Sequence, residues 1–153
     1  MVTIYHGSKA KIKGLKNPEE FRIGKRKDFG YGFYCTRDLE QADRWANRRG
    51  TSGFIYSFYY DEESAKKDLN VKTFELDDEW LDFIILNRSK DIKFDYDIVE
   101  GPMADDEIYN HINDFLDGIM SRKEFWGKAL FKYPTNQICF LSGRSIKYLK
   151  EAK

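Results

Sequence analysis

The chain has 153 residues, the size of one domain, and 41% of them are hydrophobic and 16% aromatic, which favours a globular protein over a disordered one. The longest apolar run, residues 83–86, is far shorter than the ~20 residues that a membrane-spanning helix needs. The first residues also lack the apolar segment of a signal peptide. We therefore expect a single domain over residues 1–153, in the cytoplasm and without a membrane partner.

Charge is unevenly distributed, although the formal net charge is zero. Residues 56–120 hold eighteen acidic and six basic side chains, whereas residues 1–55 and 121–153 are rich in lysine and arginine. If the two basic stretches border a cleft, their positive field would favour a ligand that carries a pyrophosphate. The alternatives are an ordinary solvated surface or a local basic face for RNA or DNA.

The predicted elements alternate irregularly between strands and helices. Strands are predicted where β-branched and aromatic residues cluster, at 2–5, 32–36, 54–60, 71–76, 97–99 and 137–141. Helices are predicted where apolar residues recur every three or four positions, at 39–46, 80–88, 105–120, 122–131 and after Gly143. This order predicts an α+β fold with a mixed, split β-sheet.

The two cysteines, Cys35 and Cys139, lie in apolar runs that resemble strands, and we expect reduced, buried thiols. With only two histidines in the chain, a structural zinc site is not expected. The sequence therefore predicts no bound metal.

Glycine and aromatic residues concentrate in the segment Asp28-Phe29-Gly30-Tyr31-Gly32-Phe33-Tyr34. Two glycines two positions apart let the backbone turn tightly and approach a ligand, and the aromatic side chains supply flat apolar walls for a planar ring. A second segment, Tyr5-His6-Gly7-Ser8, ends the first predicted strand. Together the two segments indicate a binding pocket.

These segments resemble the first two signatures of the ADP-ribosyltransferase superfamily, closest to its diphtheria-toxin and poly(ADP-ribose) polymerase branch. In that branch a His-Gly pair meets a tyrosine at the end of a Gly-x-Gly-aromatic-Tyr segment, and a second aromatic residue follows eleven positions later, where this chain has Trp45. The third signature is a glutamate on a late strand, and the similar segment here, residues 136–140, has Gln137 in its place. The pattern is therefore His-Tyr-Gln.

The resemblance covers nearly the whole chain, which looks like a family of small bacterial proteins, formerly of unknown function, within this superfamily. The shared segments include the Tyr-His-Gly-Ser start, Asp-Phe-Gly-x-Gly-Phe-Tyr, residues 79–84 and residues 101–106. The resemblance implies the ADP-ribosyltransferase-like fold, a split mixed β-sheet with flanking helices. It also implies that NAD is a substrate and that no metal is required.

The resemblance assigns roles to the residues of the three signatures. His6 would hydrogen-bond a ribose hydroxyl, and Gly7 would offer its backbone N–H and C=O to the nicotinamide carboxamide. Tyr34 and Trp45 would stack on the two faces of nicotinamide. Gln137 would bind the ribose without the negative charge of a glutamate, which typically costs about 10²–10³ in rate.

Two neighbours complete the expected NAD site. Ser8 follows the His-Gly pair, and Tyr31 competes with Tyr34 for the stacking role because it lies between the two glycines. Each signature residue also has a structural explanation: a histidine at a strand end, aromatic residues in the core, and a glutamine paired to a neighbouring strand.

Three further charged residues are auxiliary candidates. Asp105 and Asp106 would supply a carboxylate to the site or act as acidic residues in the first turn of a helix. Arg88 would bind a phosphate or compensate the C-terminus of its helix.

The sequence thus predicts an NAD-dependent mono-ADP-ribosyltransferase that releases nicotinamide and modifies a macromolecular acceptor, protein or nucleic acid. By analogy, the resemblance suggests an intracellular toxin or effector that a partner antitoxin neutralises. The alternative is a non-catalytic module that retains the fold to bind NAD or ADP-ribose, or to interact with other proteins.

Overall fold

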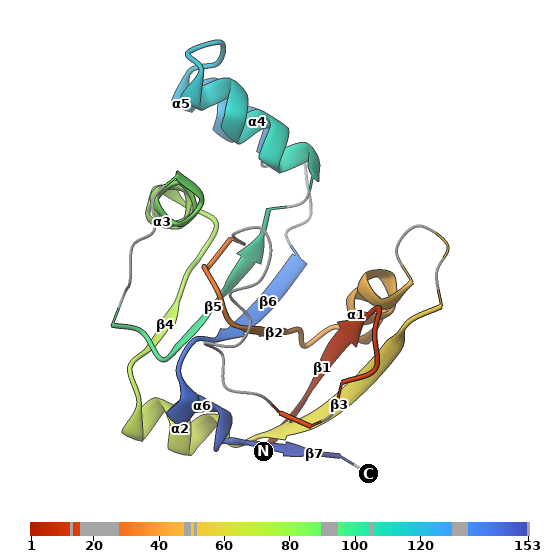
Figure 1. Cartoon of the computed structure of the whole chain (residues 1–153). Coiled ribbons are helices and arrows are strands. Elements are labelled where there is room, and N and C mark those ends of the chain that lie inside the picture. The colour runs from red at the N-terminus through yellow and green to blue at the C-terminus, as the bar shows by residue number, and fades with distance from the viewer. Residues whose placement is uncertain are drawn as a thin grey trace.

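The structure, a computed structural model, describes residues 1–12, 14–15, 28–47, 50, 52–89, 95–104, 106–129 and 135–152. The strands in this part of the chain are β1 (Val2–Ser8), β2 (Phe33–Cys35), β3 (Phe54–Tyr60), β4 (Val71–Thr73), β5 (Ile98–Met103), β6 (Thr135–Phe140) and β7 (Leu149–Glu151). The helices are α1 (Leu39–Ala46), α2 (Glu62–Asp68), α3 (Asp78–Ser89), α4 (Asp106–Leu116), α5 (Arg122–Ala129) and α6 (Gly143–Ile146) (Figure 1).

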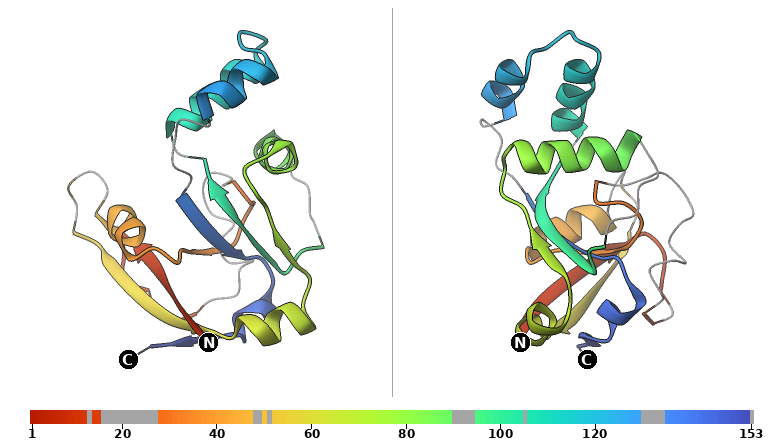
Figure 2. Two further views of the ribbon diagram at one scale, coloured as in Figure 1. Left: turned by 180° about the vertical axis from the view of Figure 1, so that it is seen from behind. Right: turned by 90° about the vertical axis from the view of Figure 1, so that its left-hand side faces the viewer.

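The strands form two sheets, and the predicted α+β class is confirmed. One sheet has the order β1-β3-β7 and is antiparallel; the other has the order β2-β6-β5-β4, with β4 parallel to β5. Within the described residues, one isolated β-bridge links them, in which Tyr5 N donates to Thr36 O and Thr36 N to Tyr5 O, each at 2.8 Å. The two sheets form two wings that open away from the end where α2 and β7 lie, with β1 and β3 in one wing and β4, β5 and β6 in the other (Figures 1 and 2).

Each face of the four-stranded sheet has its own core. On one face the core includes residues of α3, α4 and α5, and Trp80, Ile108 and Phe125 belong to the same buried cluster as Tyr34 and Cys139. The other face packs against the three-stranded sheet through a second cluster, which contains Ile4, Phe33, Phe58, Ile138 and Phe140. Both predicted thiols, Cys35 and Cys139, are buried.

Several features differ from the prediction, and two elements are shorter, since β4 ends at Thr73 instead of 76 and α4 ends at Leu116 instead of 120. The strand that was expected to end at 99 continues as β5 through Gly101 and Pro102. Proline is tolerated there because β4 ends at Thr73, opposite Glu100, so no β4 residue lies beside Pro102 to accept the hydrogen bond that its missing N–H would donate. The prediction of a C-terminal helix that includes Leu149 is wrong, since Leu149 begins β7 and pairs with Tyr60. Helix α2 was not predicted.

Helix α1 packs very closely on β1. A Cβ at Gly7 would lie 2.2 Å from the carbonyl oxygen of Ala42, and one at Gly53 would lie 1.9 Å from that of Ala46. Only glycine permits this approach of helix and strand. Asp38 starts the helix, since its side chain accepts a hydrogen bond from Glu40 N at 3.0 Å.

Candidate functional site

The strand register brings three of the predicted site residues to one face of the sheet. Tyr34 in β2 lies opposite Cys139 in β6, and Gln137 comes two residues before Cys139. Because side chains alternate along a strand, Tyr34 and Gln137 project to the same side. The bridge between Tyr5 and Thr36 extends this face to β1, where Gly7 has the same orientation as Tyr5.

His6 projects to the opposite face. Its ring stacks on Phe33, with 4.2 Å between the ring centroids, and Phe33 belongs to the core between the two sheets. Its Nδ1 lies 2.6 Å from the backbone oxygen of Tyr34. His6 therefore joins β1 to β2 directly beside Tyr34, on the other side of the strand from the Tyr34 ring.

The Tyr34 hydroxyl closes the glycine-rich turn. It donates to Gly30 O at 2.5 Å and accepts from Phe29 N at 3.1 Å, and the residue is 8% exposed. Burial, with smaller contributions from Cys139 and Asp28, raises the pKa of Tyr34 well above its ordinary value. The hydroxyl consequently remains protonated and able to donate at physiological pH.

The two glycines of the turn have structural reasons of their own. Gly30 has a φ of +92°, a conformation that side chains rarely adopt. A Cβ at Gly32 would lie 2.5 Å from Cys139 Sγ and 2.7 Å from Phe140 O. Tyr31, between them, is half-buried.

Gln137 contacts a buried carboxylate that the sequence analysis did not single out. Gln137 and Asp28 are each 3% exposed, and Gln137 Nε2 donates to Asp28 Oδ2 at 3.2 Å. Asp28 Oδ2 also accepts from Ala104 N at 2.8 Å, and Arg88 Nε donates to Asp28 Oδ1 at 2.9 Å. Gln137 Nε2 also lies 3.5 Å from the backbone oxygen of Pro102 on β5, so the predicted pairing to a neighbouring strand is present too.

Arg88 is the cation of this cluster, which we call the Asp28 centre and define as Asp28, Arg88 and Gln137. Its guanidinium lies over the Tyr109 ring, 3.5 Å from the ring centroid. Burial opposes the charged form of Arg88, but the charge of Asp28 and hydrogen bonds with Tyr109 and Asp28 outweigh it and raise the pKa of the guanidinium. Arg88 therefore compensates a buried carboxylate, a role that neither of its predicted alternatives included.

A second cluster of polar atoms lies where α1 meets the start of β6. Gln41, 1% exposed, donates through Nε2 to Asn136 O at 2.8 Å. Among the described residues, the buried oxygens Gln41 Oε1, Thr135 Oγ1 and Asn136 Oδ1 have no hydrogen-bond partner. Such acceptors are costly unless a ligand or water donates to them. No signal in the sequence identifies Gln41, because its position depends on how α1 packs against β6.

The remaining predicted residues are placed as follows. Trp45 is half-buried on α1. Ser8 forms a local turn, in which its hydroxyl donates to Ala10 O at 2.6 Å. Helix α4 begins at Asp106, whereas Asp105 lies outside the described residues.

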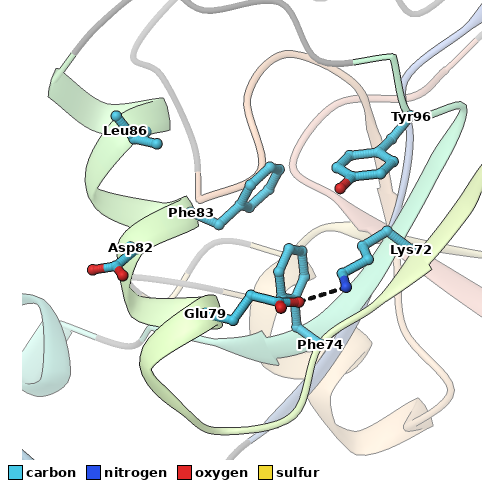
Figure 3. A pocket seen from close by; sticks show the side chains of 7 residues that line it. All are labelled: Lys72, Phe74, Glu79, Asp82, Phe83, Leu86 and Tyr96. Atoms are coloured by element: carbon cyan, nitrogen blue, oxygen red, sulfur yellow. Dashed lines mark ion pairs between the residues drawn. The ribbon is translucent and has the colours of Figure 1, made fainter.

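A pocket of about 340 Å³ lies between β4 and α3 and contains none of the predicted site residues (Figure 3). Within the described ranges, no group of three His, Cys, Asp or Glu side chains lies close enough together to hold a metal ion. No helix in the part of the chain that the structure describes has the length and apolar character needed to cross a membrane.

These features define an α+β protein with two bridged sheets and a buried polar centre beside the glycine-rich turn. A family model described as "Protein of unknown function (DUF3990)" matches residues 2–150, and the chain belongs to this family. No curated protein and no solved structure matches it.

Proposed function

We propose that this protein is an NAD-dependent mono-ADP-ribosyltransferase with the ADP-ribosyltransferase-like fold. The observation that supports this most strongly is the common face of Gly7, Tyr34 and Gln137, which come from three strands and match the three signatures in the sequence. Helix α1, which carries Trp45, packs on β1 at Gly7. Nicotinamide would bind at this face.

The reaction needs one bond to break and one to form. The bond between nicotinamide and the anomeric carbon of the ribose breaks, nicotinamide leaves with the bonding electrons, and a nucleophile of the acceptor attacks the same carbon and loses a proton. Gly7 would hold the carboxamide through its backbone, and Trp45 would stack on the ring. The acceptor is a protein or a nucleic acid, and an antitoxin partner belongs to the same proposal.

Asp28 provides a reason for glutamine at the third signature position. The Gln137 amide must direct its Nε2 to the Asp28 carboxylate, which can only accept hydrogen bonds. The group that Gln137 offers to a ribose hydroxyl is then its amide oxygen, an acceptor, as a glutamate would offer. The charge that glutamate would add is instead located one hydrogen bond further away, on Asp28.

His6 takes a positioning role in this proposal. Its contact with the Tyr34 backbone holds β2 against β1, so it would fix the spacing between Gly7 and Tyr34. The role that the sequence suggested for it, a hydrogen bond to a ribose hydroxyl, is a further proposal for the same residue.

Labelled NAD tests the activity. Incubation with whole-cell lysate, followed by protease or nuclease digestion, is expected to yield a labelled product that only one of the two treatments destroys. Trp45→Ala is expected to lower nicotinamide release at least tenfold, whereas Leu39→Ala, an exposed position on the same helix, is expected to retain the wild-type rate. Equal rates for both variants would contradict the role of Trp45.

The second candidate is a non-catalytic module that binds NAD or ADP-ribose. One observation favours it: Gln137 lacks the charge that stabilises the transition state. Calorimetric NAD binding by a folded protein that releases no nicotinamide would identify the module and exclude the transferase.

A further inference from the structure

Two buried oxygens close to Gln137 have no hydrogen-bond partner in the part of the chain that the structure describes. They are Gln41 Oε1, on helix α1, and Thr135 Oγ1, on the first residue of β6. Helix α1 and the start of β6 both lie toward the open end of the two wings (Figure 1). Because a buried polar group without a partner lowers the stability of the fold, this pair requires an explanation.

Both side chains border the face at which nicotinamide is proposed to bind. Thr135 projects to the same side of β6 as Gln137, because the two residues are two positions apart in a strand. Gln41 comes from α1, which packs on β1 at Gly7, and lies one helical turn before Trp45. The two oxygens therefore approach this face from two different elements.

The orientation of the Gln41 amide is fixed by its partner. Gln41 is 1% exposed, and its Nε2 donates to Asn136 O at 2.8 Å. A backbone oxygen can only accept, so the other end of the amide must be its oxygen. The remaining unpaired oxygen, Asn136 Oδ1, belongs to a side chain on the opposite face of β6, where its Nδ2 donates to Glu100. Gln41 thus presents an acceptor.

Together the two oxygens select a hydroxyl group. Gln41 Oε1 needs a donor, whereas the Thr135 hydroxyl can both donate and accept. A carboxylate or pyrophosphate has nothing to donate to Gln41. An ammonium or guanidinium group accepts nothing from Thr135, and its buried charge would need an unpaired carboxylate. The carboxylates that accept from Gln137 and Asn136 are already paired, Asp28 with Arg88 and Glu100 with Arg37.

We propose that Gln41 and Thr135 bind one hydroxyl of a ribose diol and so select NAD by its sugar. This hydroxyl donates to Gln41 Oε1 and accepts from the Thr135 hydroxyl, while the neighbouring hydroxyl of the same ribose donates to Gln137 Oε1. The inference rests on the proposed function, which supplies NAD as the ligand. It assigns substrate-binding roles to two residues outside the three sequence signatures.

The Thr135 hydroxyl can be removed with little change of shape. Thr135→Val is expected to leave the thermal unfolding midpoint of the free protein unchanged or to raise it, because an unpaired buried group is lost. In calorimetry the same variant is expected to bind NAD about fivefold more weakly. Thr135→Ser, which retains the hydroxyl, is the matched control and is expected to bind NAD as the wild type does. A purely structural hydroxyl would lower the midpoint instead.

Analogues of NAD that lack the 2′- or the 3′-hydroxyl of the nicotinamide ribose identify the contact. Each is expected to bind the wild type about fivefold more weakly than NAD. In Thr135→Val and in Gln41→Met, one of the two deficits is expected to disappear, because its protein partner is already lost. The other is expected to remain, because Gln137 still binds that hydroxyl.

Three outcomes would overturn the inference. A clear fall in the midpoint of free Thr135→Val would show that its hydroxyl stabilises the fold. Deficits of both analogues that persist in both variants would assign the ribose to other residues. No NAD binding by the wild type would contradict the proposed function and this inference together, whereas binding that Thr135→Val leaves unchanged would contradict this inference alone.

Discussion

Two ion pairs on opposite sides of α3 differ in burial and, as a result, in what they do. In the Asp28 centre the Asp28 side chain is 4% exposed and that of Arg88 is 24% exposed, whereas at the pocket Lys72 is 32% and Glu79 62% exposed. Desolvation makes a buried charge costly once its partner is lost, but exposed charges can turn to water at little cost. The first pair is therefore structural, and the second is expected to contribute little to stability.

The buried and the exposed ion pair also differ in how many partners hold them in place. Asp28 accepts hydrogen bonds from Arg88, Ala104 and Gln137, which come from three segments distant in sequence. The Lys72 ammonium has one carboxylate partner, Glu79. A group that joins several segments cannot leave its place without loosening all of them.

The largest expected effect is the loss of Asp28. Asp28→Ala leaves the partly buried Arg88 guanidinium without its carboxylate, and we expect the free energy of unfolding to fall by about 3–5 kcal/mol. Urea denaturation of the variant and of Asp117→Ala, an exposed control, measures this. A loss as small as that of the control would show that the Asp28 centre is not structural.

The next largest loss in the free energy of unfolding is expected for Gln137→Glu. The introduced carboxyl cannot donate to Asp28 when ionised, and the two negative charges raise its pKa in the folded state. The penalty, about 1–3 kcal/mol, is therefore present at pH 7 and declines as the pH falls through this raised pKa. Urea denaturation at pH 7 and pH 5 should show the difference from the wild type shrinking at pH 5.

Gln137→Met is the matched control, because it removes the hydrogen bond without adding charge. Its difference from the wild type should be the same at both pH values. A Gln137→Glu variant that is as stable as the wild type at pH 7 would contradict the account of why glutamine occupies this position.

The ion pair of Asp97 with Arg144 is intermediate between the Asp28–Arg88 and Lys72–Glu79 pairs. Asp97 is buried, whereas Arg144 is largely exposed. Burial alone would raise the pKa of Asp97, but hydrogen bonds from Arg144, Ser142 and Asn70 N outweigh it and lower the pKa. The stabilisation is thus complete above the unfolded pKa of about 3.9 and is lost as the pH falls through the lower folded pKa.

Asp97→Asn is expected to lower the free energy of unfolding by about 1–2 kcal/mol at neutral pH. Its difference from the wild type should decrease in strongly acidic solution. Asp95→Asn, an exposed aspartate two residues earlier, should change neither value. An Asp97→Asn difference that persists undiminished in acid would contradict the ion-pair explanation.

The smallest effect is expected at the pocket. Lys72→Met removes one exposed ion pair, so the thermal unfolding midpoint should be indistinguishable from that of the wild type. A clear fall in the midpoint would mean that Lys72 is structural, and that the two ion pairs are more alike than their burial indicates.

Local patterns in the sequence were sufficient to predict the fold class and the position of most helices and strands. Aromatic and β-branched runs identified β3 and β6, and apolar periodicity identified α1 and α3. Helix α2 was missed because its sequence, Glu-Glu-Ser-Ala-Lys-Lys-Asp, has no apolar repeat. Strand β7 was missed because its three residues, Leu-Lys-Glu, are too few to show an alternating pattern.

The candidate site was predictable to a smaller extent. The signatures identified Tyr34 and Gln137, which the structure brings to one face. The contact between Asp28 and Gln137 joins residues 109 positions apart, and it depends on how the glycine-rich turn packs against β5 and β6. Long-range packing of this kind leaves no periodic or local signal in a single sequence.

Titration of the ¹⁵N-labelled protein with NAD tests the central claim, that NAD binds at the common face of Gly7, Tyr34 and Gln137, most directly. We expect the amide signals of these residues and of Trp45 to shift together with a single dissociation constant, and to shift more than those of Lys72 and Glu79, which line the pocket between β4 and α3. No shift at millimolar NAD, or shifts confined to the pocket between β4 and α3, would contradict the proposed site.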